Sequence, residues 1–404
     1  MRLVIIIILV STLVACVSGP KDYSAAKKLT PINTTLIVKP LWVKSTGKVP
    51  VYAHAQLQPT IVGDNVYIAS VNGDVRLLNA GKGEIIWSVS LNEDLTSAPG
   101  VGENLLFIGN RNAEIIALDN KTGGERWRVS VTAEMLAKPL VAGDSLFVQT
   151  IDGKMTSLDV ASGKLIWSYS HDIPKLTLRG TATPIIYEGQ IIAGFDDGKL
   201  VSLNAETGEV SWKSVISVSR GRTDLERLVD IDGLFQVSNN TVYVTSYQGR
   251  VAAVSTKDGS IQWARKMSSY NGLAAGASHI YISDTEGQVW SLDARTGATL
   301  WRQNNLVGRE VSAPVIMGNV VVVADYEGYA HWLSVDDGQI IARQSMDKVW
   351  NEVLEPDYDD FFDDMDSEIF PRLVTTPPFA INDTLYIRDN TGALAAFQVK
   401  SATH

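Results

Sequence analysis

Histidine and cysteine are the residue types that most often bind a metal or supply a catalytic nucleophile, and this chain has few of them. It contains five histidines and one cysteine. No two of the histidines have the spacing of a zinc site; they are His54, His171, His279, His331 and His404. No nucleophile elbow, phosphate-binding loop or dinucleotide fingerprint occurs. We therefore predict no catalytic residue, no metal site and no cofactor, with a Ser-His-Asp site assembled from distant loops left open.

Residues 347–370 concentrate the negative charge of the chain. They contain ten Asp or Glu and one Lys, a local net charge of −9, against −10 for the whole chain. An EF-hand loop counted from Asp357 would need an oxygen ligand at Phe361, glycine at Phe362 and glutamate at Glu368, and only the glutamate is present. We interpret the segment as a solvated acidic loop that could dock a basic partner, with a different kind of cation site as the alternative.

The cysteine ends an N-terminal apolar stretch. "LVIIIILVSTLV" follows Arg2 and is too short to span a bilayer comfortably. It closes with "LVAC", which resembles the bacterial lipobox, in which the cysteine is acylated. The resemblance implies a signal peptide over 1–15, a lipid anchor on Cys16 and a tether over 16–38. Val17 rather than aspartate follows the cysteine, which favours the outer membrane. An ordinary signal peptide or an uncleaved membrane anchor is the alternative.

Composition narrows the class of protein. Apolar residues make up 45% of the 404 residues and charged residues 20%, as in a globular chain. The formal net charge of −10 argues against nucleic-acid binding and against a protein held on anionic lipid by overall basic charge. A chain of this length holds either two or three domains or one large repeat domain.

A repeat of roughly 40 residues decides between these possibilities. Each copy has a strand rich in Val, Ile, Leu, Tyr or Phe, a turn with glycine and a second alternating strand. A D-x-x-T-G turn and a strand carrying tryptophan complete it. The first turn occurs eight times, at Gly73, Ala113, Gly153, Gly198, Gly249, Gly287, Gly328 and Gly392. The tryptophan follows the second turn at Trp87, Trp127, Trp167, Trp212, Trp263 and Trp301, and Ala342 replaces it in the seventh copy.

The two ends of the repeat region complement one another. The eighth copy stops at "ALAAFQVK" without its tryptophan strand, and "PLWVKS" around Trp42 supplies one at the N-terminal end. A last blade completed by the N-terminal strand closes a ring without a free edge. We therefore predict an all-β fold, an eight-bladed β-propeller of four-stranded antiparallel blades over residues 39–400. The tryptophans are expected to fill the spaces between blades and to point their N–H at turn carbonyls.

Three connections between blades are longer than the repeat requires. They are "SYSHDIPKLTLRGTATP", "KSVISVSRGRTDLERLVDIDG" and the acidic segment, and all follow a tryptophan-type strand. Such connections share one face of a propeller, and the first two flank the fourth blade. Leu176, Leu178 and Arg179 lie in the first connection, and the second carries the mixed-charge stretch "SRGRTDLERLVDID". Two such neighbouring connections have the make-up of a docking surface, with leucines for buried area and charges for register.

The repeats resemble two families of propeller proteins. "LDNKTGGERW" and "LDARTGATLW" are similar to the tryptophan-docking repeats of pyrroloquinoline-quinone (PQQ) dehydrogenases. Those enzymes are longer and typically carry adjacent cysteines, which this chain lacks. The lipobox, the eight repeats, "LTLRG-x-x-x-P" and "ERLVDID" together resemble the BamB (YfgL-type) lipoproteins of the outer-membrane β-barrel assembly machinery, over about residues 13–345 and 373–400.

The BamB resemblance implies a function. It implies a non-catalytic scaffold on the periplasmic face of the outer membrane of a Gram-negative bacterium. Such a scaffold binds the POTRA repeats of the central barrel subunit and assists nascent outer-membrane proteins. Carried over to this chain, the resemblance implies that the partner-binding residues are Leu176, Leu178, Arg179, Asp230 and Asp232. The insertion over 347–372 and the pair Gly233-Leu234 depart from that family's pattern. The alternatives are a PQQ-dependent enzyme and a propeller that pairs unfolded strands with an exposed blade edge.

Overall fold

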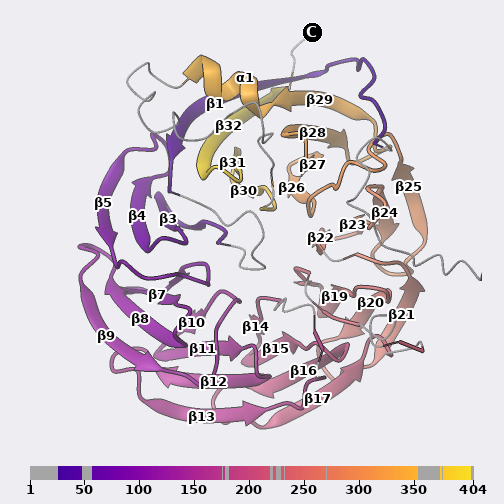
Figure 1. Ribbon diagram of the computed structural model, residues 1–404. Helices are drawn as coiled ribbons and strands as arrows, with labels where there is room; N and C mark the ends of the chain where they lie inside the picture. The colour runs from indigo at the N-terminus through magenta and orange to yellow at the C-terminus, as the bar shows by residue number, and fades with distance from the viewer. Residues whose placement is uncertain are drawn as a thin grey trace, which may run out of the picture.

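The computed structural model shows a ring of eight four-stranded antiparallel sheets, the predicted propeller (Figure 1). It describes residues 26–47, 57–174, 176–177, 182–218, 222–223, 229–231, 233–269, 271–353, 374 and 376–401. Within these residues no helix is both long enough and apolar enough to cross a membrane. Each blade is numbered here by its place along the chain, and its strands run outward from the axis in chain order.

The first four blades each occupy one continuous stretch of chain. Blade 1 consists of β2 (Thr60–Val62), β3 (Asn65–Ala69), β4 (Asp74–Asn79) and β5 (Ile85–Ser90). Blade 2 consists of β6 (Gly100–Val101), β7 (Leu105–Gly109), β8 (Glu114–Asp119) and β9 (Glu125–Ser130). Blade 3 consists of β10 (Leu140–Ala142), β11 (Ser145–Thr150), β12 (Lys154–Asp159) and β13 (Leu165–Ser170). Blade 4 consists of β14 (Ile185–Tyr187), β15 (Gln190–Gly194), β16 (Lys199–Asn204) and β17 (Val210–Val215).

The last four blades include the one that the two chain ends share. Blade 5 consists of β18 (Gln236–Ser238), β19 (Thr241–Thr245), β20 (Arg250–Ser255) and β21 (Ile261–Lys266). Blade 6 consists of β22 (Leu273–Ala275), β23 (His279–Ser283), β24 (Val289–Asp293) and β25 (Thr299–Gln303). Blade 7 consists of β26 (Val315–Met317), β27 (Val320–Ala324), β28 (Tyr329–Ser334) and β29 (Ile340–Ser345). Blade 8 consists of β30 (Phe379–Ile381), β31 (Thr384–Arg388), β32 (Ala393–Ser401) and β1 (Leu36–Ser45).

The tryptophans join each blade to the next, as the sequence predicts. Seven of them donate the indole N–H to a carbonyl of the following blade over 2.8–3.0 Å: Trp42 to Ala80, Trp87 to Asn120, Trp127 to Val160, Trp167 to Ala205, Trp212 to Thr256, Trp263 to Ala294 and Trp301 to Val335. Each ring lies on the glycine of a D-x-x-T-G-type turn. A Cβ added to Gly338, for example, would lie 2.5 Å from the Trp301 ring. The repeat therefore encodes the contact between blades as well as the blade itself.

Blade 8 is closed by the N-terminal strand, which confirms the predicted ring closure. Strand β1 pairs antiparallel with β32, from Leu36 opposite Ser401 to Ser45 opposite Ala393. The β-bulge that precedes the tryptophan in the other blades recurs here between Pro40 and Trp42. The strand therefore reproduces the local geometry of a fourth strand although it comes from the other end of the chain.

Closure explains why the seventh copy has Ala342 instead of tryptophan. The third and fourth strands of blade 8 are the two ends of the chain, so no turn glycine joins them and no tryptophan can lie on one. The helix α1 (Met346–Val353) covers this position instead. Its Met346 and Val349 are buried in one cluster with Ala342 and with Leu36 of β1. The helix is the described part of the acidic insertion, and residues 354–372 lie outside the described residues.

Candidate functional site

The two long connections that flank blade 4 carry the predicted docking residues. Of these, the structure describes Leu176 and Asp230, whereas Leu178, Arg179 and Asp232 lie outside the described residues. Leu176 is 48% exposed. It therefore has the exposure that a docking residue needs.

Both connections rest on blade 4. Ala182 from the first and Ile231 from the second belong to one buried cluster, together with Trp212 and the inner strands of blade 4. Ile231 covers Gly194 so closely that a Cβ there would lie 2.5 Å from its Cγ2. The bases of the two connections are therefore fixed to the same blade and share one core.

Asp230 lies elsewhere than expected. The sequence suggests polar contacts at the border of an interface, but the side chain of Asp230 is only 1% exposed. Val229 and Ile231 on either side are also buried, and the Asp230 carbonyl accepts a hydrogen bond from the Tyr247 N–H over 3.0 Å. In this conformation Asp230 belongs to the interior of the second connection rather than to its outer surface. The turn folds inward because two aliphatic neighbours are drawn into the core.

A histidine holds the start of the first connection. The His171 ring stacks on Phe195 with centroids 4.2 Å apart, and its Nε2 lies 3.0 Å from Asp197 Oδ2. Tyr169 lies 3.2 Å from the other ring nitrogen, and Lys199 Nζ donates to Asp197 over 2.5 Å. His171 begins the connection, whereas Phe195 and Asp197 lie in the first turn of blade 4. The cluster therefore ties the exposed loop to a rigid blade.

Electrostatics favour the ionised form of Asp197. Burial alone would raise the pKa of its carboxyl group, but hydrogen bonds from His171 and Lys199 outweigh that effect and lower the pKa below its usual value. A carboxylate held in this way fixes both of its partners. The sequence offers His171 only as a possible zinc ligand and gives no signal for this role, because the contact joins the end of blade 3 to blade 4.

Val218 is a second residue that the sequence analysis missed. It lies in the second connection and is 55% exposed. Among its described residues outside the strands, each connection therefore exposes one aliphatic side chain, Leu176 or Val218. Within the described ranges, no group of three or more His, Cys, Asp or Glu is placed to hold a metal ion. Exposed aliphatic groups on fixed loops are suited to contact with another protein.

Known proteins share both the sequence and the shape of this chain. A family model described as outer membrane protein assembly factor BamB matches residues 71–303 and 285–403. The BamB of Pseudomonas aeruginosa is 39% identical over 96% of both chains. The BamB of Alkalilimnicola ehrlichii is 40% identical over 92% of this chain and 91% of that protein. The crystal structure of BamB from Moraxella catarrhalis covers 90% of this chain and all of its own, with a TM-score of 0.77 and 26% identity.

The quinoprotein likeness is one of fold alone. The quinohemoprotein alcohol dehydrogenase of Comamonas testosteroni covers 89% of this chain with a TM-score of 0.67, but only 9% of the aligned residues are identical. The two proteins share the propeller fold, and a shared fold does not carry an activity.

Proposed function

The chain belongs to the family of the outer membrane protein assembly factor BamB, and we propose that it acts as a non-catalytic scaffold in that assembly. In the proposal it binds the POTRA repeats of the central barrel subunit on the periplasmic side of the outer membrane. The docking surface is the pair of connections around blade 4. The observation that supports it is that both connections are fixed to blade 4 and each exposes an aliphatic side chain, Leu176 and Val218.

The energetic argument rests on those aliphatic groups. Covering an exposed leucine or valine by a partner contributes about 1.5–3 kcal/mol for a fully buried side chain. Both residues lie on connections whose bases are fixed to blade 4, which limits the entropy lost on binding. Leu178, Arg179 and Asp232 remain in the proposal as further partner-binding residues, although they lie outside the described residues. Asp230 would act by shaping the second connection.

Membrane attachment completes the proposal. Cys16 would carry the acyl chains, since it is the one cysteine of the chain and ends a lipobox-like stretch. Stable attachment by lipid requires more than one acyl chain, because each buried methylene contributes about 0.8 kcal/mol. Replacement of Cys16 by serine would then release the protein from the membrane fraction, as measured by fractionation and immunoblotting. A Cys16→Ser chain that stays in the outer membrane would show that another element attaches it.

The partner-binding proposal has a matched pair of variants. Leu176→Asp places a charge on the candidate surface, and Ile86→Asp places one at a comparably exposed residue (53%) on the outer strand of blade 1. We expect Leu176→Asp to lose the central subunit during co-purification from native membranes and Ile86→Asp to retain it. Both variants must keep the thermal unfolding transition of the unaltered chain. Equal recovery of the subunit with both variants would contradict the proposal.

A second contact, with nascent outer-membrane proteins, is suggested by the outer strands. On β13, the outermost strand of blade 3, the side chains of Leu165 and Ile166 are 63% and 50% exposed. An outermost strand has an unpaired edge to which an extended chain can add. A photo-crosslinker at Ile166 is expected to capture unfolded barrel proteins, whereas one at the charged Arg126 of blade 2 is not. Equal capture at both positions would remove this part of the proposal.

A further inference from the structure

Residues 26–35 form a strap along the outer edge of blades 6 and 7 (Figure 1). The Lys27 N–H donates to the Val307 carbonyl over 3.0 Å, and the Thr35 N–H donates to the Ile341 carbonyl over 2.9 Å. Leu29 and Ile32 pack against the buried cluster between blades 6 and 7. Although the sequence places these residues in a tether, the structure holds them on the propeller.

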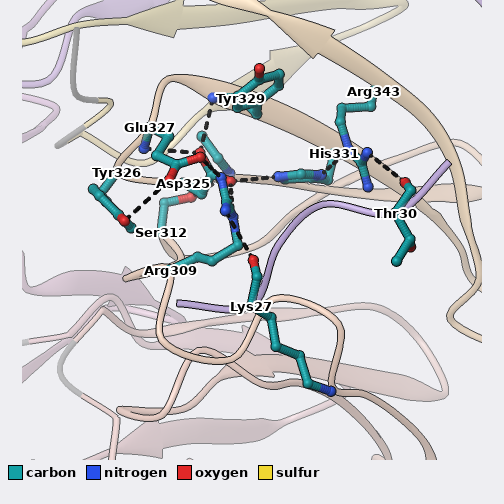
Figure 2. A network of polar contacts seen from close by, with 11 residues as sticks. Lys27, Thr30, Arg309, Ser312, Asp325, Tyr326, Glu327, Tyr329, His331 and Arg343 are labelled. Carbon is teal, nitrogen blue, oxygen red and sulfur yellow. Dashed lines mark hydrogen bonds and ion pairs between the residues drawn. The ribbon is translucent and has the colours of Figure 1, made fainter. Parts of the chain in front are cut away.

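Two arginines clamp the strap by its backbone (Figure 2). Arg309 Nη1 donates to the Lys27 carbonyl over 3.2 Å, and Arg343 Nη1 donates to the Thr30 carbonyl over 3.0 Å. Arg309 is buried, and its Nε donates to Asp325 Oδ2 over 2.7 Å while Nη2 pairs with Glu327. The two carboxylates therefore fix the Arg309 guanidinium group, and its Nη1 donates to the strap.

A buried histidine orders the second arginine. Arg343 Nε lies 3.2 Å from His331 Nδ1, and His331 Nε2 lies 2.8 Å from Asp325 Oδ2. Since a guanidinium group only donates, His331 Nδ1 must accept and Nε2–H must donate to Asp325. Burial lowers the pKa of His331, although Asp325 opposes the shift, so the ring stays neutral and keeps this arrangement. The buried Asp325 carboxylate therefore orients both arginines, Arg309 directly and Arg343 through His331.

The strap fixes where the chain leaves the propeller. Ten residue steps separate Ala26 from Cys16, so the acylated cysteine lies within about 36 Å of Ala26. A compact domain of this size is roughly 50 Å across. An anchor on Cys16 therefore holds the edge of blades 6 and 7 near the membrane and keeps the opposite edge from reaching it on its own.

The edge next to the strap has the chemistry of a headgroup contact. Trp290 lies between Arg265 and Arg302, with guanidinium carbons 5.2 and 5.1 Å from its ring. Arg302 is exposed, as are Lys27 and Lys28 of the strap, and the Lys27 ammonium donates to the Asn304 carbonyl. Tryptophan and long basic side chains suit the phosphate level of a bilayer.

Two acidic groups beside Trp290 are engaged within the fold. Asp284 accepts the Trp290 indole N–H over 2.7 Å, and Asp293 is held by Thr296 in its own turn. Other carboxylates are exposed in the turns of blades 6 and 7, and the acidic insertion begins directly after β29. The cationic surface is therefore local to the strap and to the outer strand of blade 6.

We propose that the outer edge of blades 5–7 faces the phospholipid headgroups. In this proposal the strap holds the chain that leads to the lipid anchor at a fixed place on the propeller and does not act as a flexible linker. The inference rests on the proposed acylation of Cys16. Its occupant is a phospholipid leaflet, because the chain toward the anchor leaves from this edge and the exposed Lys27, Lys28 and Arg302 beside it are cationic. The blade 4 connections would then point away from this edge along the ring.

The test uses the full-length acylated chain in vesicles of phosphatidylethanolamine and phosphatidylglycerol. Because the one native cysteine carries the lipid, an introduced cysteine is the one free thiol. A fluorophore is attached at Asn305→Cys beside the strap or at Ser130→Cys on blade 2, and both positions are exposed. A quencher attached to lipid headgroups is expected to quench the Asn305 label several-fold more than the Ser130 label.

A strap variant separates the outcomes. Leu29→Asp with Ile32→Asp removes the apolar contacts of the strap and leaves both arginines in place, and we expect it to equalise the two labels. Equal quenching in the unaltered chain, while the protein still floats with the vesicles, would overturn the membrane-facing edge. A chain that does not float would instead overturn the lipid anchor itself.

Discussion

At the scale of single residues, the proposed docking surface depends on side chains that anchor its connections as much as on side chains that are exposed. His171 and Asp197 lie in different blades, and no local pattern in the sequence predicts that they meet. Leu176 is different, because a leucine in an overlong polar connection stands out from the repeat. Leu176 could thus be predicted from the sequence. Val218, the burial of Asp230 and the histidine contact could not, because they depend on packing between distant segments.

Asp197→Asn is expected to lower the free energy of unfolding by about 1–3 kcal/mol at neutral pH, because it weakens charge-assisted hydrogen bonds to His171 and Lys199. The pKa of Asp197 is lowered in the fold, so its ionised form stabilises the protein above the unfolded pKa. This contribution is lost as the pH falls through the folded value. Urea unfolding at pH 7 and at about pH 3 measures the difference.

The control for that measurement is Asp144→Asn, which changes an exposed carboxylate. It is expected to alter the free energy of unfolding by less than about 0.5 kcal/mol at either pH. A cost of Asp197→Asn that stays the same at low pH would show that the carboxylate charge contributes nothing.

At the scale of elements, the sequence predicts the repeated unit well because each unit is local. A strand, a glycine turn and a tryptophan recur at a fixed spacing, and the tryptophan finds its glycine in the next copy. The strap and α1 lack such a pattern. The strap covers the outer edge of blades 6 and 7, and α1 covers the position where the seventh tryptophan is absent. Elements that occur once could not be placed from the repeat.

Gly338→Ala tests the contact between blades. The new Cβ would lie 2.5 Å from the Trp301 ring, and the residue has a φ of +71°. We expect the free energy of unfolding to fall by roughly 2–4 kcal/mol, as measured by thermal or urea unfolding. Gly318 in the same blade is the control, because its φ is +58° but nothing lies within 4 Å of an added Cβ.

Gly318→Ala is expected to cost only the backbone strain, about 1 kcal/mol. The difference between the two variants isolates the contact with the tryptophan ring. Equal losses would mean that backbone strain alone accounts for the glycine and that the ring contact is dispensable.

At the scale of the whole molecule, the ring closes through β1 and through one buried arginine. Arg388 of β31 donates to the carbonyls of Leu57, Ala69 and Gly47 over 2.7, 3.1 and 3.4 Å. Leu57 lies in the connection into blade 1, Ala69 is the last residue of β3, and Gly47 lies just after β1. Burial lowers the pKa of Arg388 to about 10, so it remains charged at neutral pH. The sequence predicts the closing strand from Trp42, but not this arginine.

Arg388→Met is expected to lower the free energy of unfolding by at least about 3 kcal/mol, because it leaves buried carbonyls without a donor. The exposed Arg126→Met is the control and should cost less than about 1 kcal/mol. Urea unfolding of the purified chains compares the two. Similar small losses in both would show that β1 alone closes the ring.

The whole-molecule account assigns separate parts of the ring to separate partners. The connections around blade 4 face the proposed protein partner, and the edge of blades 5–7 faces the membrane. Both assignments place binding on segments that depart from the repeat, whereas the repeat itself supplies a rigid frame.

The docking of blade 4 is the central claim, and an equilibrium binding measurement tests it most directly. Purified chain is titrated with the purified POTRA repeats of the central subunit, and the Kd is compared for the unaltered chain, Leu176→Asp and Ile86→Asp. The account predicts that Leu176→Asp raises Kd by at least about 30-fold, the equivalent of ~2 kcal/mol, while Ile86→Asp changes it by less than about threefold. Equal values of Kd for the unaltered chain and Leu176→Asp would contradict the claim.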